Sequence, residues 1–264
     1  MLKPIILKIG GSVVTDKSKP FSARKRIVKR ISGEVATAIR SGCPPLVIVH
    51  GGGSFGHPIA QKHGIHKGFR EKTQLIGFVE TVQVMRRLSD IIAESLQASG
   101  VPALPLQPSA ITLQKGGRIA TMFSRSVEEA LKMGLIPVLW GDAVLDEEKG
   151  FSILSGDQIV SHLSALLSPS RVVFGTDVDG IYPSDPKKGE AKPFRELTRA
   201  ELEKITIQSG ESGGIDVTGG MKGKLQEIIA ITSMGVEVIV MNAMKAGNVL
   251  RALSGGKVGT LVKP

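Results

Sequence analysis

The strongest constraint on the fold is an alternation of short apolar runs with longer amphipathic stretches, which continues along the whole chain. The short runs are rich in β-branched residues, have the length of strands buried on both faces, and are mostly followed by glycine. They predict strands over residues 4–9, 46–49, 103–106, 137–140, 171–174, 236–241 and 259–262. Apolar residues at helical spacing predict helices over residues 22–41, 72–99, 124–133, 156–167, 199–204 and 221–234. This alternation favours an α/β fold with a largely parallel sheet and helices on both faces.

Two segments interrupt the alternation. Asp142–Phe151 has charged residues and a glycine at its centre, which favours a β-hairpin or flap beside the sheet. Tyr182–Pro193 is rich in proline, lysine and aspartate, which favours a surface excursion. Neither segment has the composition of a linker, and 264 residues can bury one large core, so we expect a single domain over residues 1–264.

The charge of the chain narrows the class of partner. A formal net charge of +10 calls for an anionic partner, and nucleic acids and phosphorylated metabolites are the two obvious classes. Aromatic residues make up only 4% of the chain, so the stacking platforms of a single-strand binder are scarce. The densest basic run, residues 24–30, has the apolar spacing of an amphipathic helix and is interpreted as its solvated face. We therefore favour a small phosphorylated ligand over nucleic acid.

Cysteine content and hydropathy indicate the compartment. The single cysteine, Cys43, excludes an internal disulfide framework and a cysteine-based zinc site. No apolar run approaches the roughly 18 residues of a membrane span. We therefore expect a cytoplasmic protein in a reducing compartment that does not bind a membrane.

Glycine-rich loops lie at the predicted carboxyl ends of strands, where open α/β sheets bind their ligands. Lys8–Ser12 ends the first predicted strand, His50–His57 ends the second, and Thr218–Lys224 leads into the last predicted helix. Glycine lets backbone N–H groups approach phosphate oxygens, and a helix that starts there adds its positive end. Each loop alone is better explained as a tight turn between a strand and a helix. Three together, two of them with lysines, favour a long polyphosphate ligand.

Two common nucleotide motifs do not account for these loops. No G-x-x-x-x-G-K-[ST] sequence occurs, so the chain is not a P-loop enzyme. Gly51, Gly53 and Gly56 match the dinucleotide pattern G-x-G-x-x-G, and Glu71 lies near the position of a ribose-binding acid. That motif needs a helix that starts at the loop and a second strand that leads to the acid. Pro58 disfavours the helix and Glu71 lies in a polar stretch, so we do not expect a dinucleotide site.

Five segments resemble, in order, the motifs of the amino acid kinase superfamily, and the resemblance extends over essentially the whole chain. They are Lys8–Ser12, His50–His57, Ser155–Asp157, Gly175–Tyr182 and Thr218–Met221. The resemblance implies an αβα sandwich around a mostly parallel sheet of about eight strands, and often a homodimer. It also implies that ATP binds over the C-terminal part of the chain and the acceptor over the N-terminal part.

The resemblance implies a role for each matching position. Lys8 would contact the transferring phosphoryl group, Lys224 would hold the ATP phosphates, and Asp157 would orient both lysines without acting as a base. Lys17 would add charge in the transition state. The other residues expected to bind ATP are Gly10, Gly11, Ser12, Gly53, Asp177 and Gly220, and those expected to bind the acceptor phosphate are Gly52, His57 and Gly156. Lys222 is close in sequence, but Lys224 fits the Gly-Gly-Met-x-x-Lys pattern of the family.

The chemistry of the acceptor bears on His57. Phosphoryl transfer needs fixed positive charges and N–H donors, which the lysines and glycine amides would supply. A hydroxyl acceptor often needs a carboxylate base, whereas a phosphate, with a second pKa of roughly 6, is already largely deprotonated at neutral pH. A histidine N–H can bind such an oxyanion, so we predict that His57 holds a phosphate acceptor in line. We expect Mg²⁺ to arrive with the ATP phosphates and to need no dedicated metal site.

The loop Ser54–His57 resembles that of the archaeal-type subfamily that converts isopentenyl phosphate to isopentenyl diphosphate, and it is similar to that of the fosfomycin kinases. We therefore expect ATP-dependent phosphorylation of isopentenyl phosphate, with Phe78 and Ile153 beside the isoprenoid tail. Transfer to a phosphonate, to UMP or to a carboxylate is the nearest alternative. A nucleotide sensor or nucleic-acid binder without turnover is a more distant one, which the presence of Lys8, Asp157 and Lys224 together disfavours.

Overall fold

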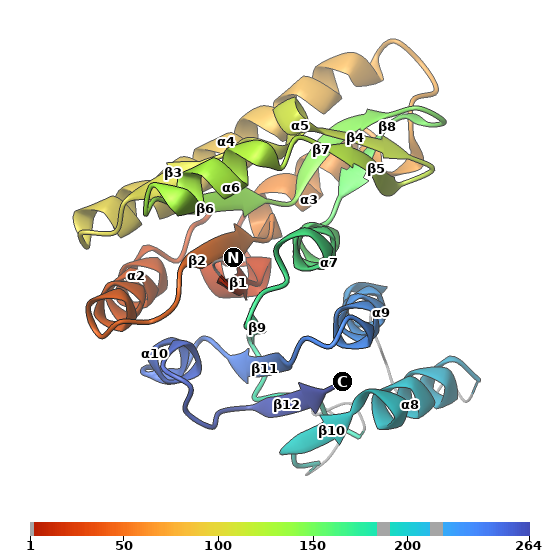
Figure 1. Cartoon of the computed structure of the whole chain (residues 1–264). Coiled ribbons are helices and arrows are strands. Elements are labelled where there is room, and N and C mark those ends of the chain that lie inside the picture. Colours follow the sequence, from red (N-terminus) through yellow and green to blue (C-terminus); the bar gives the residue numbers. More distant parts are fainter. Residues whose placement is uncertain (1–2, 184–190, 212–218) are drawn as a thin grey trace.

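The computed structural model describes residues 3–183, 191–211 and 219–264, with the side chains of residues 208–211 and 219–222 outside that description. Its centre is an eight-stranded sheet in the order β10-β12-β11-β9-β1-β2-β6-β3 (Figure 1). The strands are β1 (Ile5–Ile9), β2 (Leu46–His50), β3 (Ala103–Pro105), β6 (Ile136–Trp140), β9 (Arg171–Thr176), β10 (Glu196–Thr198), β11 (Val238–Asn242) and β12 (Thr260–Lys263). All seven strands expected from the sequence lie in this sheet, which confirms the α/β fold.

The six strands from β11 to β3 run parallel, while β12 and β10 at one edge run in the opposite direction. β1 lies in the middle, paired with β9 on one side and β2 on the other. The carboxyl ends of β9, β1, β2 and β6 therefore meet at one edge of the sheet. This edge is where the sequence predicted the ligand.

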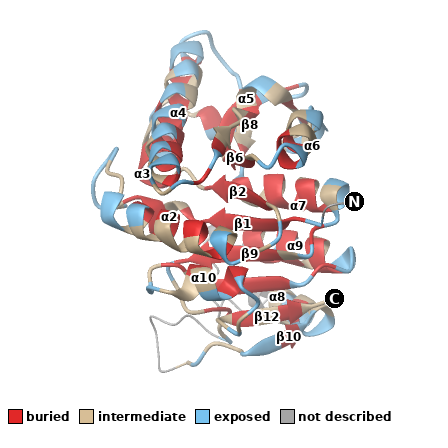
Figure 2. Cartoon of the chain, turned by 60° about the vertical axis from the view of Figure 1, so that its left-hand side comes forward, coloured by how far each residue is buried: buried red, intermediate tan, exposed pale blue. Residues whose placement is uncertain are grey.

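Helices cover both faces of the sheet, and the strands between them are buried (Figure 2). Ile5, Leu7 and Ile9 of β1 pack into the core on one face, whereas Ile6 packs into the core on the other. A strand whose alternate residues enter two cores is apolar throughout, which explains why these strands were recognisable in the sequence. The helices are α2 (Lys25–Arg40), α4 (Gln74–Ala98) and α10 (Asn248–Leu253) on the first face, and α6 (Arg125–Lys132), α7 (Gly156–Leu167), α8 (Arg199–Glu211) and α9 (Gly219–Ser233) on the second.

A second sheet of four strands, in the order β5-β4-β7-β8, lies on the side of the molecule that contains β3 and β6 (Figure 1). The hairpin of β7 (Asp142–Asp146) and β8 (Gly150–Leu154) confirms the prediction for residues 142–151. The hairpin of β4 (Thr112–Lys115) and β5 (Arg118–Met122), preceded by the short helix α5 (Pro108–Ile111), was not predicted. Nor was β10, a three-residue edge strand.

Side chains hold the second sheet together and tie it to the helices. The Asp146 carboxylate accepts N–H bonds from Gly116 and Gly117 in one hairpin turn and from Glu148 and Lys149 in the other. Toward the rest of the molecule, the Gln158 side chain of α7 donates to the Gly117 carbonyl at 3.1 Å. On the same side, the Arg118 guanidinium of β5 pairs with the buried Glu227 carboxylate of α9.

The prediction for the segment after β2 was wrong in one respect. A helix, α3 (Gly53–Lys62), does start at the glycine loop and contains Pro58. Pro58 has no N–H to donate to the carbonyl of Ser54, four residues earlier. That carbonyl accepts the Phe21 N–H instead, at 3.0 Å. The second requirement of a dinucleotide motif is still missing, because the 3₁₀ turn η1 (Ile65–Lys67), and no strand, lies in the described chain between α3 and Glu71.

Two further observations concern the rest of the chain. Among the residues that the structure describes, no helix is both long and apolar enough to cross a membrane. The predicted excursion Tyr182–Pro193 lies largely outside the described residues, because 184–190 are not among them.

Candidate active site

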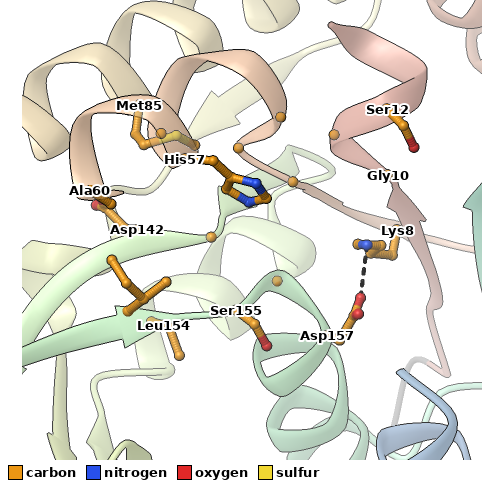
Figure 3. Close-up of a pocket in the computed structure, with 18 of the residues that line it drawn as sticks. Lys8, Gly10, Ser12, His57, Ala60, Met85, Asp142, Leu154, Ser155 and Asp157 are labelled. Carbon is orange, nitrogen blue, oxygen red and sulfur yellow. Dashed lines mark ion pairs between the residues drawn. The ribbon is translucent and has the colours of Figure 1, made fainter. Parts of the chain in front are cut away.

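A cavity of about 640 Å³ opens at the carboxyl ends of β9, β1, β2 and β6. The Lys8 side chain from β1 and the His57 side chain from α3 both point into it, with Asp157 of α7 and the N-cap residue Ser155 on the facing side (Figure 3). Asp142, Ile153 and Leu154, from the second sheet, complete the wall. Both sheets therefore contribute to one site.

Two buried lysines meet on one carboxylate in this cavity. Lys8 Nζ is 2.8 Å from Asp157 Oδ1, and Lys224 Nζ donates to Asp157 Oδ2 at 2.9 Å. Lys8 is 7% exposed and Lys224 is 8% exposed, so both charges are largely removed from bulk water. Asp157 lies in the first turn of α7, where the Ser155 side chain caps the helix and the helix dipole favours a negative charge.

The charges in this cluster depend on one another. Burial opposes ionisation of Asp157, but the charges of Lys8 and Lys224 outweigh it and hold the Asp157 pKa below its usual value. Burial, and then the nearby charge of Lys8, lower the Lys224 pKa to about 8, against the attraction of Asp157. At pH 7 Asp157 is therefore ionised and Lys224 is still largely protonated. Two lysines on one carboxylate leave an excess of positive charge for an anion.

The loops after β1 and β2 touch backbone to backbone. A Cβ on Gly11 would lie 2.7 Å from the Cα of Gly53, and a Cβ on Gly51 would lie 2.6 Å from the Gly11 nitrogen. Gly53 has φ +49°, and the Thr15 hydroxyl fills the space that a side chain would need. The loops lie this close only because they carry no side chains. Gly11 and Ser12 begin the short helix α1 (Gly11–Val14) and Gly53 begins α3, so their N–H groups have no partner within the helix and can bind phosphate oxygens.

His57 is the side chain of α3 that faces the anion-binding edge. Lys17, from the loop after α1, lines the same cavity. Partial burial, and then the charge of Lys17, lower the His57 pKa below its usual value, so the ring is neutral at pH 7 and keeps one N–H donor. The side chain is nevertheless exposed to solvent, so an acceptor can reach it.

The end of the cavity beyond His57 is mostly apolar. Its apolar lining residues are Ala60, Met85, Ile153 and Leu154, and the polar lining residues from the same part of the chain are Gln61, His66, Thr81 and Asp142. Phe78 is not a lining residue, because its ring stacks on Phe151 with centroids 5.3 Å apart, in a small cluster that also contains Ile153. The structure therefore puts Ile153 at the cavity surface, whereas Phe78 packs in the same cluster without lining the cavity.

The cavity unites most of the residues that the resemblance marked. Those that line it are Lys8, Gly10, Gly11, Ser12, Lys17, Gly52, Gly53, His57, Ile153, Gly156, Asp157, Asp177 and Lys224. Gly220 lies in the first turn of α9, but its surroundings are outside the described part of the chain. The Lys222 side chain and Thr218 are also outside it. The structure tests where these residues lie, and their individual roles stay predictions.

Sequence reasoning missed Gly141 and Asp142, which line the cavity directly after β6. The rule that found the other loops applies to them as well, because β6 is the parallel neighbour of β2. The Asp142 carboxyl accepts the N–H groups of Ser109 and Ala143 at 3.3 and 3.0 Å. Burial nevertheless raises the Asp142 pKa to about 7.

The carboxylates that line the cavity leave little to hold a metal ion directly. In the described part of the chain, no three histidine, cysteine, aspartate or glutamate side chains are grouped to bind one. Asp157 is engaged by two lysines and Asp142 by two N–H groups. Asp177, the third carboxylate that lines the cavity, cannot complete a cation site alone, so a cation here would need further ligands from an anionic substrate.

Fixed lysines, helix-start N–H groups and an accessible histidine are the groups that phosphoryl transfer between two anions requires. On an α/β sheet with no P-loop sequence, they define the site of a small-molecule kinase.

Comparison with known proteins identifies the family. Residues 3–242 match the amino acid kinase family. The chain is 38% identical over 262 residues to the isopentenyl phosphate kinase of Methanothermobacter thermautotrophicus, with 96% of each chain covered. A solved isopentenyl phosphate kinase superposes with a TM-score of 0.85 at 36% identity, and the match covers 98% of this chain and 100% of that one. A solved substrate complex of an isopentenyl phosphate kinase superposes with a TM-score of 0.80 at 27% identity, and this match also covers 98% of this chain and 100% of that one. The chain belongs to the amino acid kinase family, and within it to the isopentenyl phosphate kinases.

Proposed function

We propose that the protein transfers the γ-phosphoryl group of ATP to isopentenyl phosphate and so forms isopentenyl diphosphate and ADP. The observation that carries the proposal is the position of His57 and the Lys8–Asp157–Lys224 cluster on one cavity. Relatives with this name, similar over nearly the whole chain, support the choice of acceptor.

The transfer exchanges one bond for another at the γ-phosphorus. An oxygen of the acceptor phosphate forms a bond to phosphorus while the bond to the oxygen bridging to ADP breaks. Lys8 and Lys17 stabilise the charge that spreads over the equatorial oxygens, and Lys224 binds the leaving ADP side. Asp157 holds the two buried lysines and needs to accept no proton, because the acceptor is already an oxyanion.

His57 and the glycine N–H groups hold the acceptor phosphate in line with ATP. A neutral His57 donates one N–H, and a bound dianion raises the tendency of the ring to take up a second proton. Gly52 and Gly156 line the same part of the cavity and supply backbone there. The apolar end, with Ile153 at its surface, receives the isoprenoid tail, and Phe78 supports that wall from behind.

Gly10, Gly11, Ser12, Gly53, Gly220 and Asp177 bind ATP in this proposal. Mg²⁺ joins as a complex with the ATP phosphates, where it neutralises part of their charge. The part of the chain around β1, β2 and β6 then forms the acceptor half of a single domain, and the part from β9 onward forms the ATP half. We also propose a cytoplasmic location, which the use of ATP and the one unpaired cysteine, Cys43, support. The proposed oligomeric state is a homodimer, which analytical ultracentrifugation tests.

An acceptor screen tests the proposed reaction. Purified protein is incubated with Mg-ATP and, in separate reactions, isopentenyl phosphate, fosfomycin, UMP and glutamate, and ADP release is measured. The expected result is the highest kcat/KM with isopentenyl phosphate, together with isopentenyl diphosphate as product. Faster turnover of another acceptor would show that the proposed substrate is wrong, and ATP binding without any turnover would indicate a sensor.

The variant His57→Ala tests the acceptor site. Loss of one charge-assisted donor to an oxyanion is expected to lower kcat/KM for isopentenyl phosphate about 100-fold, with little change in the KM for ATP. His162→Ala, on α7 outside the cavity, is the matched control. An unchanged kcat/KM in folded His57→Ala protein would place the acceptor elsewhere.

A further inference from the structure

The loop that carries Lys17 is closed at its base. Thr15 and Ala23 form an isolated antiparallel bridge, and the Asp16 N–H donates to the Ser22 carbonyl at 2.8 Å. The Asp16 carboxylate also accepts the N–H and the hydroxyl of Ser18, which makes a tight turn around Lys17. The base of the loop is thus fixed, but the position of Lys17 over the cavity depends on how the loop tilts.

Phe21 has a backbone conformation that needs an explanation. Its φ is +54°, in the left-handed region that bulky side chains rarely adopt. Such a conformation costs free energy and persists only where surrounding contacts hold it. Two contacts do so, and both reach α3: the Phe21 N–H donates to the Ser54 carbonyl at 3.0 Å, and its ring meets the Phe55 ring edge-on at 5.9 Å.

Pro58 makes the first contact available. In a regular helix the carbonyl of Ser54 would accept the N–H of residue 58, four positions later. Proline has no N–H, so this carbonyl has no partner within α3 and receives the Phe21 N–H. A proline inside the helix therefore creates the acceptor that docks the loop.

Ser54 holds both ends of the loop at once. Its N–H donates to the Thr15 hydroxyl at 2.9 Å, and its carbonyl accepts from Phe21. Thr15 in turn donates to the Gly11 carbonyl at 2.7 Å, which ties the loop to the glycine edge. His57 is on the same helix, three residues after Ser54, so the contacts that dock the loop are made to the helix that carries His57.

We propose that Phe21 is a positioning residue for Lys17, and that it docks the loop on the Ser54 carbonyl that Pro58 leaves free. This inference rests on the proposed phosphoryl transfer, in which Lys17 stabilises the transition state. Phe21 does not line the cavity and is 46% exposed, so it acts through Lys17 and not by contact with substrate.

A double-mutant cycle on kcat tests the proposal. Lys17→Ala is expected to lower kcat about 100-fold, and Phe21→Ala about 10-fold, because a misplaced catalytic group loses much of its effect. In the Lys17→Ala background, Phe21→Ala should lower kcat less than twofold further. Phe21→Tyr keeps the ring contact and should remain within twofold of the parent protein. Equal effects of Phe21→Ala with and without Lys17 would overturn the proposal.

A second readout does not depend on turnover. The Lys17 charge is one of the two causes that lower the His57 pKa, the other being burial. Phe21→Ala should therefore raise the His57 pKa, measured by NMR titration, in the same direction as Lys17→Ala, and should not raise it further in that background. An unchanged His57 pKa in Phe21→Ala, where Lys17→Ala raises it, would contradict the docking of Lys17 by Phe21.

Pro58→Ala provides an independent route, and protects the test if Phe21→Ala fails to fold. The restored N–H of residue 58 competes with the Phe21 N–H for the Ser54 carbonyl, so this variant, like Phe21→Ala, should lower kcat, by two- to fivefold. If the acceptor screen identifies a substrate other than isopentenyl phosphate, the double-mutant cycle of Lys17 and Phe21 is measured with that substrate, and the same outcomes test the proposal. An activity of Pro58→Ala equal to that of the parent would show that the free carbonyl is not needed.

Discussion

The glycine edge and the second sheet face the same cavity but are held in place by different means. At the glycine edge, the loops of Gly11 and Gly53 touch backbone to backbone, and the Thr15 hydroxyl bridges the Gly11 carbonyl and the Ser54 N–H beside that contact. In the second sheet, the backbones of the two hairpins pair only where Gln114 lies opposite Asp146. The other ties between the hairpins are made by side chains, above all by Asp146, and the sheet reaches the helices through Gln158 and Arg118. Backbone contact fixes a position to a fraction of an ångström, whereas a side-chain tie can be lengthened or exchanged.

The difference corresponds to what each region binds in the proposed reaction. Every phosphate has the same size and oxygen geometry, so a rigid backbone cradle suits it. The tail of an acceptor can vary in length and shape, so a wall held by replaceable side chains can change without harm to the phosphate end. The comparison can be tested, because each type of contact predicts a different response to a small substitution.

The largest effect is expected from Gly11→Ala. The new methyl group would overlap the backbone of Gly53, and neither loop can retreat, so the variant should lose more than 100-fold in kcat/KM and about 3 kcal/mol of stability. Urea unfolding and the kinase assay measure the two losses.

Gly33→Ala on α2 is the matched control, since a Cβ there has no heavy atom within 4 Å. It should keep full activity and gain about 0.5–1 kcal/mol, as glycine in a helix interior is costly. Full activity of Gly11→Ala would mean that the glycine edge is as adaptable as the second sheet.

An intermediate effect is expected from Asp146→Asn. Burial opposes ionisation of Asp146, but the N–H of Lys149, the hydroxyl of Ser152 and further donors outweigh it and lower its pKa from 3.8 to about 2. A depressed acid pKa adds stability that is complete above about pH 4 and is lost as the pH falls toward 2. The variant should lose about 1–2 kcal/mol at pH 7 and show a shallower loss between pH 4 and 2.

Unfolding midpoints across this pH range check the prediction, and Asp90→Asn on the exposed side of α4 is the control. Activity at pH 7 should fall less than tenfold, because the phosphate end is held independently. A loss as large as that of Gly11→Ala would erase the distinction between the two regions.

The smallest effect is expected from Arg118→Ala. Arg118 is an exposed side chain, but its partner Glu227 is buried on α9, one turn after Lys224. Loss of the pair leaves a buried carboxylate without its cation and loosens the helix that carries Lys224, so the KM for ATP should rise about threefold.

The combination of Arg118→Ala with Glu227→Gln should recover most of that loss, since it removes the unpaired charge. Arg125→Ala is the control, because Arg125 is 75% exposed and lies 3.8 Å from Glu129. If all three proteins have the KM of the parent, the second sheet has no influence on the ATP side.

The same contrast explains what the sequence could predict. Strands of the main sheet enter a core on each face, and seven of the eight were recognised from their apolar runs, the exception being the three-residue edge strand β10. β5 has no buried residue, so its composition does not differ from that of a loop. Most of the site was found from strand ends and from the family resemblance, whereas Asp142 was missed because its segment was interpreted only as a hairpin. Pro58 led to a wrong prediction for the helix after β2, because the hydrogen bond that it removes is replaced by one from Phe21, which is distant in sequence.

The central place of β1 in the sheet also sets an order of assembly during synthesis. One edge of β1 is taken by β2, which leaves the ribosome soon afterwards, whereas the other edge waits for β9, more than 150 residues later. The loops after β1, β2 and β6 and the partner of Lys8 on α7 are therefore synthesised before β9, β11 and β12. Until then a row of unpaired backbone groups is exposed along β1, so a nascent chain that stalls before Arg171 presents an adhesive edge to its neighbours.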